Sequence, residues 1–300
     1  MKKLLVALLL STVPVSAFAA PKVVVSIVPL HSLVAGVMEG MASPELLLQG
    51  VNSEHSGSYS PQQISDLAHA DVVFIIGDNL EVKLGEISGT ETVNGKAFVK
   101  LDQAAGIVKH SIREGGNWEI DADEPATGNT VDPHIWLDPE NAKAMTKAIA
   151  GALALADPAN ANTYNSNMAK QVEELDRLET EIKSALGSVS HKPFIVFHDA
   201  YQYFETRFGL HAAGSITDYS AAAASAKRLD EIRTKIISSK AACVFKEPQY
   251  SDASVKVVTE GSPAKIGVLD PIGAGLALGK DTYAVLLRNL TKNLTDCLGS

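Results

Sequence analysis

Beyond its first twenty residues the 300-residue chain has no long apolar segment, and no cysteine lies near that leader. A membrane-spanning helix needs about 20 consecutive apolar residues, so none is predicted, and there is no site for a lipid anchor. The leader itself contains Lys2 and Lys3, a short apolar core, and small residues at Ala17 and Ala19. This pattern is typical of a secretory signal peptide that is cleaved after Ala19. We therefore expect a soluble protein of the bacterial periplasm.

Basic residues are also in short supply. The chain has 26 lysines and arginines against 35 aspartates and glutamates, and its net charge of −9 becomes −11 without the two leader lysines. Nucleic acid and anionic membranes repel such a protein, so neither is expected as a partner, whereas a cationic ligand is compatible with the charge.

Only two cysteines are present, Cys243 and Cys297. In a chain exported to an oxidising compartment, they are expected to form a disulfide bond. The alternative is two separate buried thiols.

Short β-branched runs alternate with segments of helical periodicity, which predicts an α/β protein with parallel sheets and flanking helices. Strands are expected at residues 23–28, 45–51, 71–77, 97–101, 193–197, 241–245 and 265–269. Helices are expected to begin at Ser32 and Pro61 and to cover about 139–156, 201–208, 223–238 and 281–297. The segment 158–186 has the longest helical periodicity and would be about 40 Å long at 1.5 Å per residue.

These patterns predict the organisation of the chain: a signal peptide at 1–19, an N-terminal α/β lobe at 20–157, a linking helix at 158–187 and a C-terminal α/β lobe at 188–300. The N-terminal lobe includes an acidic loop, 112–132, which is rich in Gly, Asn, Asp and Glu and contains no histidine. Because the loop has no periodicity, it is expected to lie on the surface.

Three histidines lie in polar loops or directly behind a predicted strand. His55 and His198 follow strands, His134 lies in a polar loop, and Asp270 follows the strand 265–269. Open α/β sheets bind their ligands at the carboxyl ends of the strands. Three imidazoles and a carboxylate that meet there would suit a tetrahedral Zn²⁺ site. Each histidine can equally be an ordinary hydrogen-bonded residue, so the residues alone leave both interpretations open.

The segments around these residues resemble the zinc-specific branch of the cluster A-I periplasmic metal-binding proteins of ABC importers. The motifs that carry the resemblance are His55 with Pro61, and the segments 68–81, 132–139, 198–204, 247–250 and 269–273. The resemblance implies two α/β lobes joined by one long rigid helix, with the metal site in the cleft between the lobes.

The same resemblance implies a set of ligands and partners. His55, His134 and His198 would bind the metal, with Asp270, the neighbouring Glu54 or water completing the coordination shell. Zn²⁺ would be the transported ligand. The partners would be the membrane permease of an ABC zinc importer and a periplasmic zinc chaperone, and the protein itself would be a monomer.

His198 is the position that bears on the choice of metal. Manganese-type relatives tend to carry Glu there, and an imidazole favours Zn²⁺ over Mn²⁺. Cys243 and Cys297 also resemble a disulfide of some zinc-type members.

Other functions stay open at this point. One alternative is a manganese- or iron-binding member of the same transport family. Another is a zinc-dependent hydrolase with Glu54 as its general base, but the chain has no His-Glu-x-x-His motif and no Ser/His/Asp arrangement, so no enzyme is expected. An adhesin or scaffold is also compatible with the pattern.

Overall fold

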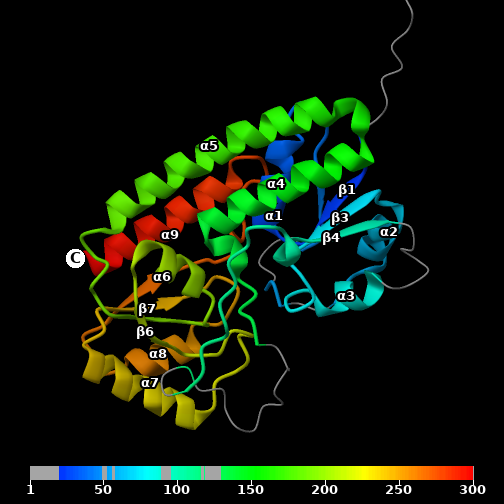
Figure 1. Cartoon of the computed structure of the whole chain (residues 1–300). Coiled ribbons are helices and arrows are strands. Elements are labelled where there is room, and N and C mark those ends of the chain that lie inside the picture. Colours follow the sequence, from blue (N-terminus) through cyan, green and yellow to red (C-terminus); the bar gives the residue numbers. More distant parts are fainter. Residues whose placement is uncertain are drawn as a thin grey trace, which may run out of the picture.

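The computed structural model describes residues 20–48, 53–55, 58–88, 96–115, 118 and 130–299. The expected signal peptide and most of the expected acidic loop lie outside these residues. Within them, the chain forms two four-stranded parallel sheets with helices packed against them (Figure 1). The predicted α/β class is therefore confirmed. None of the described helices is long and apolar enough to cross a membrane.

The first sheet has the strand order β2-β1-β3-β4. Its strands are β1 (Val23–Val25), β2 (Glu45–Leu46), β3 (Val72–Ile75) and β4 (Ala97–Lys100). Strands β1 and β3 are wholly buried, as is usual for the inner strands of a parallel sheet. The strand predicted at 23–28 ends early. Pro29 lies in the first turn of α1 (Val28–Val37), where a proline favours a helix start and cannot continue a strand ladder.

The second sheet has the strand order β6-β5-β7-β8. Its strands are β5 (Phe194–Val196), β6 (Ala212–Ser215), β7 (Cys243–Lys246) and β8 (Lys265–Val268). Strand β6 was not predicted, because its alanines, glycine and serine form strands poorly on their own. It forms by pairing with β5, where Ile195 lies opposite Gly214 and Val196 opposite Ser215.

Both sheets therefore repeat one strand order, in which the first strand lies between the second and the third. In each sheet the chain passes from the first strand to its neighbour on one side, and from the third strand to its neighbour on the other side. A gap opens at such a switch point beyond the carboxyl ends of the strands, and open α/β sheets bind their ligands there.

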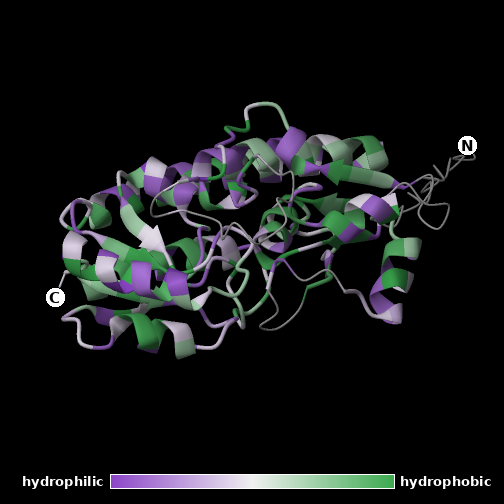
Figure 2. Ribbon diagram, turned by 90° about the horizontal axis from the view of Figure 1, so that it is seen from below, coloured by the Kyte–Doolittle hydropathy of each residue, from purple (hydrophilic) through white to green (hydrophobic). Residues whose placement is uncertain are grey.

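Shorter helices flank the sheets. These are α2 (Pro61–His69), α3 (Val82–Ser88), α6 (Gln202–Phe208), α7 (Ala226–Ser239) and α8 (Ala253–Thr259). Helix α2 starts at the predicted Pro61, behind a capping box in which Ser60 and Gln63 exchange side-chain and backbone hydrogen bonds. In Figure 2, hydrophobic and hydrophilic bands alternate along the outer helices, as expected when each buries a single stripe of side chains.

Two long helices, α5 (Ala161–Leu186) and α9 (Thr282–Leu298), pack against elements of both halves of the molecule, and a third, α4 (Pro139–Ala156), packs against α5. Helix α5 has 26 residues and follows a 3-10 turn at Pro158–Asn160, so the predicted long helix is confirmed. Figure 1 shows it running past both sheets. Helix α9 packs against both α5 and α1, so the last helix of the chain returns to the first half.

The two halves share a continuous hydrophobic core. Val25 of β1, Tyr164 of α5 and Phe245 of β7 belong to the same buried cluster. Cys243 of β7 and Cys297 of α9 form the predicted disulfide, with Cα atoms 6.3 Å apart. The disulfide thereby ties the second sheet covalently to the helix that packs against α1 in the first half.

Candidate metal centre

His198 is positioned by the first strand of the second sheet. It follows β5 at the carboxyl edge of that sheet and is fully buried. Its Nδ1 lies 2.7 Å from Oε2 of Glu247, which follows β7 at the same edge. The other oxygen of Glu247 accepts a hydrogen bond from the hydroxyl of Tyr201 at 3.0 Å. Glu247 therefore holds the ring of His198 in one orientation.

His134 begins the 3-10 turn Ile135–Leu137 that leads into α4. Oδ1 of Asp132 accepts a hydrogen bond from the backbone N–H of His134 at 2.9 Å and lies 2.8 Å from its Nδ1. The indole of Trp136 donates to the carbonyl oxygen of Pro271 at 2.8 Å, so the turn is also attached to the second half of the chain. His134 and Asp132 are both buried. This histidine, like the first, is held by a carboxylate at its Nδ1.

Glu54 and His55 lie on the segment behind β2, of which residues 53–55 are described. Glu54 is buried. Beside it, the hydroxyl oxygen of Ser53 lies 2.6 Å from that of Tyr250 in the second half of the chain. This contact holds the segment against the edge of the second sheet, where His198 lies.

Four side chains converge between these elements: one ligand atom from each of Glu54, His55, His134 and His198 lies within 4.8 Å of the others. The Nε2 atoms of His134 and His198 are 3.3 Å apart, and Oε1 of Glu54 lies 3.8 and 3.6 Å from them, respectively. The ring centroid of His55 lies 5.4 Å from that of His134 and 5.7 Å from that of His198. The structure thus brings the three predicted histidines together with Glu54.

Several polar atoms of this group have no hydrogen-bond partner within the described part of the chain. They are both carboxylate oxygens of Glu54 and Nε2 of His55, and all three are buried. Buried polar atoms usually have partners, because leaving one unpaired costs free energy. A cation bound by all four side chains would satisfy these atoms together.

Asp270, one of the candidates that the sequence offered for the fourth ligand beside Glu54 and water, does not belong to this group of four. One oxygen of its carboxylate accepts hydrogen bonds from the side chain of Gln249 at 2.7 Å and from the backbone N–H groups of Ile272 and Gly273 at 3.1 and 2.9 Å. Asp270 thus stabilises the turn behind β8, and Glu54 is the carboxylate that lies among the three imidazoles.

Burial and mutual contacts shift the pKa values within the group. Burial is the main reason that the pKa of His134 and that of His55 both fall to about 3. Burial would raise the pKa of Glu54, but its contact with His198 and the charges of the imidazoles outweigh that effect and lower it to about 2.

The pKa of His198 shifts in the other direction. Burial would lower it, but the carboxylates of Glu247 and Glu54 outweigh burial and raise it to about 10. The direction of these shifts favours, near neutral pH, a metal-free group of one carboxylate, two neutral imidazoles and one imidazolium. A metal ion would have to displace the Nε2 proton of that imidazolium.

The sequence pattern of the family described as "Zinc-uptake complex component A periplasmic" matches residues 23–297, nearly the whole chain. The chain belongs to this zinc-uptake family. The high-affinity zinc uptake system protein ZnuA of Brucella abortus is 42% identical over 305 residues, covering 92% of this chain and 91% of the relative. The protein of the same description from Yersinia pestis is 32% identical, covering 93% and 92%.

Solved structures of related proteins share the fold of this zinc-uptake family member. A zinc-bound deletion mutant of ZnuA matches with a TM-score of 0.77 at 25% identity, covering 93% of this chain and 98% of that one. The periplasmic zinc-binding protein TroA of Treponema pallidum has a TM-score of 0.78, with coverage of 93% and 99%. At 20% identity, the second comparison supports the fold alone.

The sequence interpretation assigned no role to Asp132 and Glu247, the two carboxylates that hold the imidazoles in this zinc-uptake family member. Both stand in motifs that carried the resemblance. Glu247 lies directly behind β7, the neighbour of β5, which His198 follows, and Asp132 is two residues before His134. For Glu247 that position was the available signal, because residues behind adjacent parallel strands meet at one edge of the sheet.

A second acidic group consists of Glu140, Asp176 and Glu179 on α4 and α5. The ammonium group of Lys143 contacts all three carboxylates, at 2.6 Å for Asp176 and 3.1 Å for Glu179. The lysine already supplies the cation, so this group is an ion-pair network that joins the two helices.

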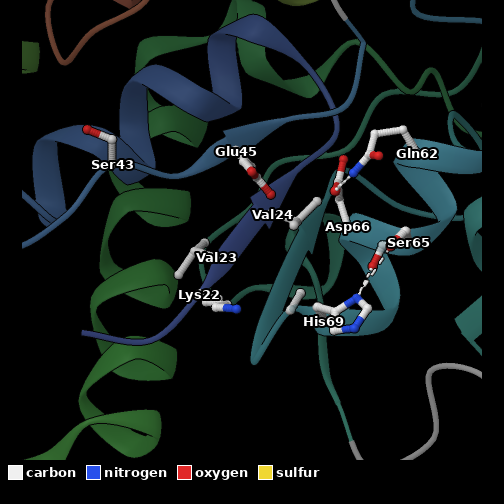
Figure 3. A pocket seen from close by; sticks show the side chains of 10 residues that line it. Lys22, Val23, Val24, Ser43, Glu45, Gln62, Ser65, Asp66 and His69 are labelled. Carbon is white, nitrogen blue, oxygen red and sulfur yellow. Dashed lines mark hydrogen bonds between the residues drawn. The ribbon is translucent and has the colours of Figure 1, made fainter. Parts of the chain in front are cut away.

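A separate pocket of about 410 Å³, shown in Figure 3, is lined by residues at the amino ends of strands of the first sheet. The four-residue group lies beyond the carboxyl ends of the strands. The pocket is lined by Lys22 and Val23 at the start of β1 and by Ser65 and His69 of α2, among others. Nδ1 of His69 lies 2.7 Å from the carbonyl oxygen of Ser65 within the helix. Because it lines this pocket, His69 lies apart from the four-residue group.

Proposed function

We propose that this protein captures Zn²⁺ in the periplasm and delivers it to the membrane permease of an ABC-type zinc importer. The observation that carries the proposal is the buried convergence of three imidazoles and one carboxylate. Membership of the zinc-uptake family supports the choice of both metal and process.

In this proposal the metal ligands are Nε2 of His55, His134 and His198 and the carboxylate of Glu54. Hydrogen bonds at Nδ1 to Asp132 and Glu247 direct the Nε2 lone pairs of two imidazoles toward the metal. Four nitrogen and oxygen ligands suit the tetrahedral preference of Zn²⁺. Of the candidates that the sequence left open for the fourth ligand, Glu54 fits better than Asp270, because its oxygens are buried, lack a hydrogen-bond partner and lie close to the imidazoles.

The ligand set also bears on the alternative functions. Three imidazoles and one carboxylate make a softer site than the two-carboxylate site of manganese-type relatives, which supports Zn²⁺ over Mn²⁺ or iron. Catalytic zinc sites keep one position open for water, whereas four protein ligands would leave none. Reversible binding is therefore a better fit to this group than hydrolysis.

The proposal includes where the protein works and with what. The chain would be exported with residues 1–19 as its signal peptide and released after cleavage behind Ala19. It would act as a monomer that receives zinc from the periplasm or from a zinc chaperone. The mature protein would then begin at Ala20.

The test is metal analysis of the mature protein, purified from periplasm without added metal, followed by competition against a zinc chelator and against excess Mn²⁺. We expect one Zn²⁺ per chain, retained in the presence of Mn²⁺. Deleting the gene should impair growth in zinc-depleted medium, and the wild-type copy should restore it where a His134→Ala copy does not. A purified protein that carries manganese, or growth that is indifferent to the deletion, would contradict the proposal.

A further inference from the structure

The described ends of the acidic loop form a short two-stranded stem. Ser111 and Val131 pair as an antiparallel bridge, the N–H of Ile112 donates to the carbonyl oxygen of Thr130 at 3.2 Å, and the N–H of Asp132 donates to that of His110 at 3.0 Å. The second arm of the stem leads through Asp132 directly to His134. The position of the stem therefore determines the position of the carboxylate that holds His134.

Arg113 attaches this stem to the second half of the molecule. Its Nε lies 2.9 and 3.0 Å from the two carboxylate oxygens of Asp199, and its Nη1 and Nη2 lie 3.1 and 2.9 Å from those of Glu205. Nη2 contacts Asp199 as well. The Arg113 side chain is only 16% exposed, and both carboxylates are 5% exposed. Such charge-assisted, forked contacts are among the strongest hydrogen bonds in proteins.

The two carboxylates belong to the part of the chain that carries His198. Asp199 is its immediate neighbour, and Glu205 lies on α6, the helix that begins three residues later. A second connection runs parallel to the first. The hydroxyl of Tyr203 on α6 accepts from the N–H of His110 at 3.0 Å and donates to the carbonyl oxygen of Asp132 at 2.8 Å.

The stem and α6 thus connect the two histidines that lie closest together. One side of the connection continues through Asp132 to His134, and the other continues through Asp199 to His198. Arg113 is the only cation that the structure shows in contact with both Asp199 and Glu205 among the described residues. Without it, two buried carboxylates on the α6 side would lose their shared counter-charge, and the stem would lose its ionic attachment to α6.

We propose that Arg113 is a positioning residue for the metal site, which holds the His134 side against the His198 side and so slows the release of the bound ion. The inference rests on the proposed function, because it takes the four-residue group as the zinc site. Arg113 does not itself touch the group. It acts through the stem and through the turn that follows His198.

The test compares zinc release from the wild-type mature protein and from Arg113→Ala and Arg113→Lys, by stopped flow with excess chelator. Residues that orient metal ligands typically account for roughly 10- to 100-fold in affinity. We expect Arg113→Ala to show a loss of this size, mainly as faster dissociation. Lysine keeps the charge but not the fork, so Arg113→Lys should recover part of the loss. The visible spectrum of the Co²⁺-substituted protein should change in Arg113→Ala, since it reports the arrangement of the ligands.

Arg207→Ala is the matched control. Arg207 also lies on α6 and forms a forked pair with a carboxylate of the other half, at 2.7 and 2.8 Å to the two oxygens of Asp138. In this pair Arg207 contacts neither Asp132 nor Asp199. We expect Arg207→Ala to melt at a lower temperature but to keep the wild-type release rate and cobalt spectrum.

If Arg113→Ala does not fold, Glu205→Gln serves as the second variant, because it keeps the shape of the joint and removes one of its two carboxylates. It should also release zinc faster than the wild type. A wild-type release rate and cobalt spectrum in the folded Arg113 or Glu205 variant would overturn the inference alone. A wild-type protein that binds no zinc would overturn the proposed function as well.

Discussion

The Nε2 atoms of His134 and His198 lie 3.3 Å apart, although 64 positions separate the two residues in the chain. The first precedes α4 and the second follows β5, so a metal held by both would join the two halves of the molecule. Replacing either histidine by alanine should weaken zinc binding by roughly three orders of magnitude, because each removes one of only four ligands.

Titration against a competing chelator measures this effect. His69→Ala is the control, because His69 lines the pocket of Figure 3, at the amino ends of strands of the first sheet. It should bind zinc as the wild type does. Zinc binding of wild-type strength in His134→Ala would place the site elsewhere.

Glu247→Gln should weaken zinc binding by about 10- to 100-fold, since carboxylates that hold a ligand imidazole have effects of this size. Glutamine keeps the shape and can still accept a hydrogen bond from Nδ1 of His198, but it lacks the charge that makes the imidazole a stronger ligand. Calorimetric competition measures the affinity. The matched control is Glu181→Gln, which breaks an exposed pair with Arg288 that should contribute little. Equal affinities in the two variants would contradict the role of Glu247.

The sequence predicted those helices and strands whose start residues and apolar spacing can be identified within a short stretch of the chain. Asp138 and Pro139 predicted the start of α4, and Asp138 does cap the helix by accepting from the N–H of Glu140 at 2.9 Å. The regular apolar spacing after Pro158 predicted α5. Strand β6 could not be found in this way, since Gly214 and its neighbours become a strand only through pairing with β5.

The candidate site shows the same limit. Positions behind strands identified His55 and His198, because the strand direction alone decides which residues reach the carboxyl edge of a sheet. Two carboxylates were available to complete the group, and the sequence could not decide which one turns inward. Asp270 bonds to its own turn, whereas Glu54 lies among the imidazoles. The contact of Glu247 with His198, 49 residues away, depends on how β5 and β7 pair.

The disulfide between Cys243 and Cys297 should stabilise the protein without affecting its zinc site. It joins two residues that are 54 positions apart in the chain, for which chain-entropy arguments give about 4 kcal/mol. The double variant Cys243→Ala/Cys297→Ala should therefore melt at a temperature lower by on the order of ten degrees, as calorimetry would measure.

Zinc stoichiometry should stay at one in that variant, since neither cysteine belongs to the four-residue group. The wild type treated with reductant is the control and should approach the melting temperature of the variant. A melting temperature unaffected by both treatments would contradict a stabilising role.

Zinc binding should release about one proton per metal at pH 8. In the metal-free protein, the carboxylates of Glu247 and Glu54 outweigh burial and raise the pKa of His198 to about 10, so its imidazole is protonated at this pH. The pKa of His134 and that of His55 are lowered to about 3, so both are already neutral. Because zinc binds only the neutral imidazole, it must displace one proton, from His198.

The sign of the pH dependence follows from the direction of these shifts. With its pKa raised to about 10, His198 is protonated throughout pH 5 to 9. Each pH unit lowers the concentration of competing protons tenfold, so zinc affinity should rise about tenfold per pH unit over that range. Three imidazoles with ordinary pKa values near 6.5 would instead release almost no protons at pH 8 and several at pH 5.

Calorimetry in buffers of different ionisation enthalpy counts the released protons at each pH. Glu247→Gln removes the main cause of the raised pKa, so its proton release at pH 8 should fall toward zero, while Glu181→Gln should match the wild type. A wild-type protein that releases no proton at pH 8 would show that His198 is neutral before zinc arrives, and that Glu247 orients the ring without charging it.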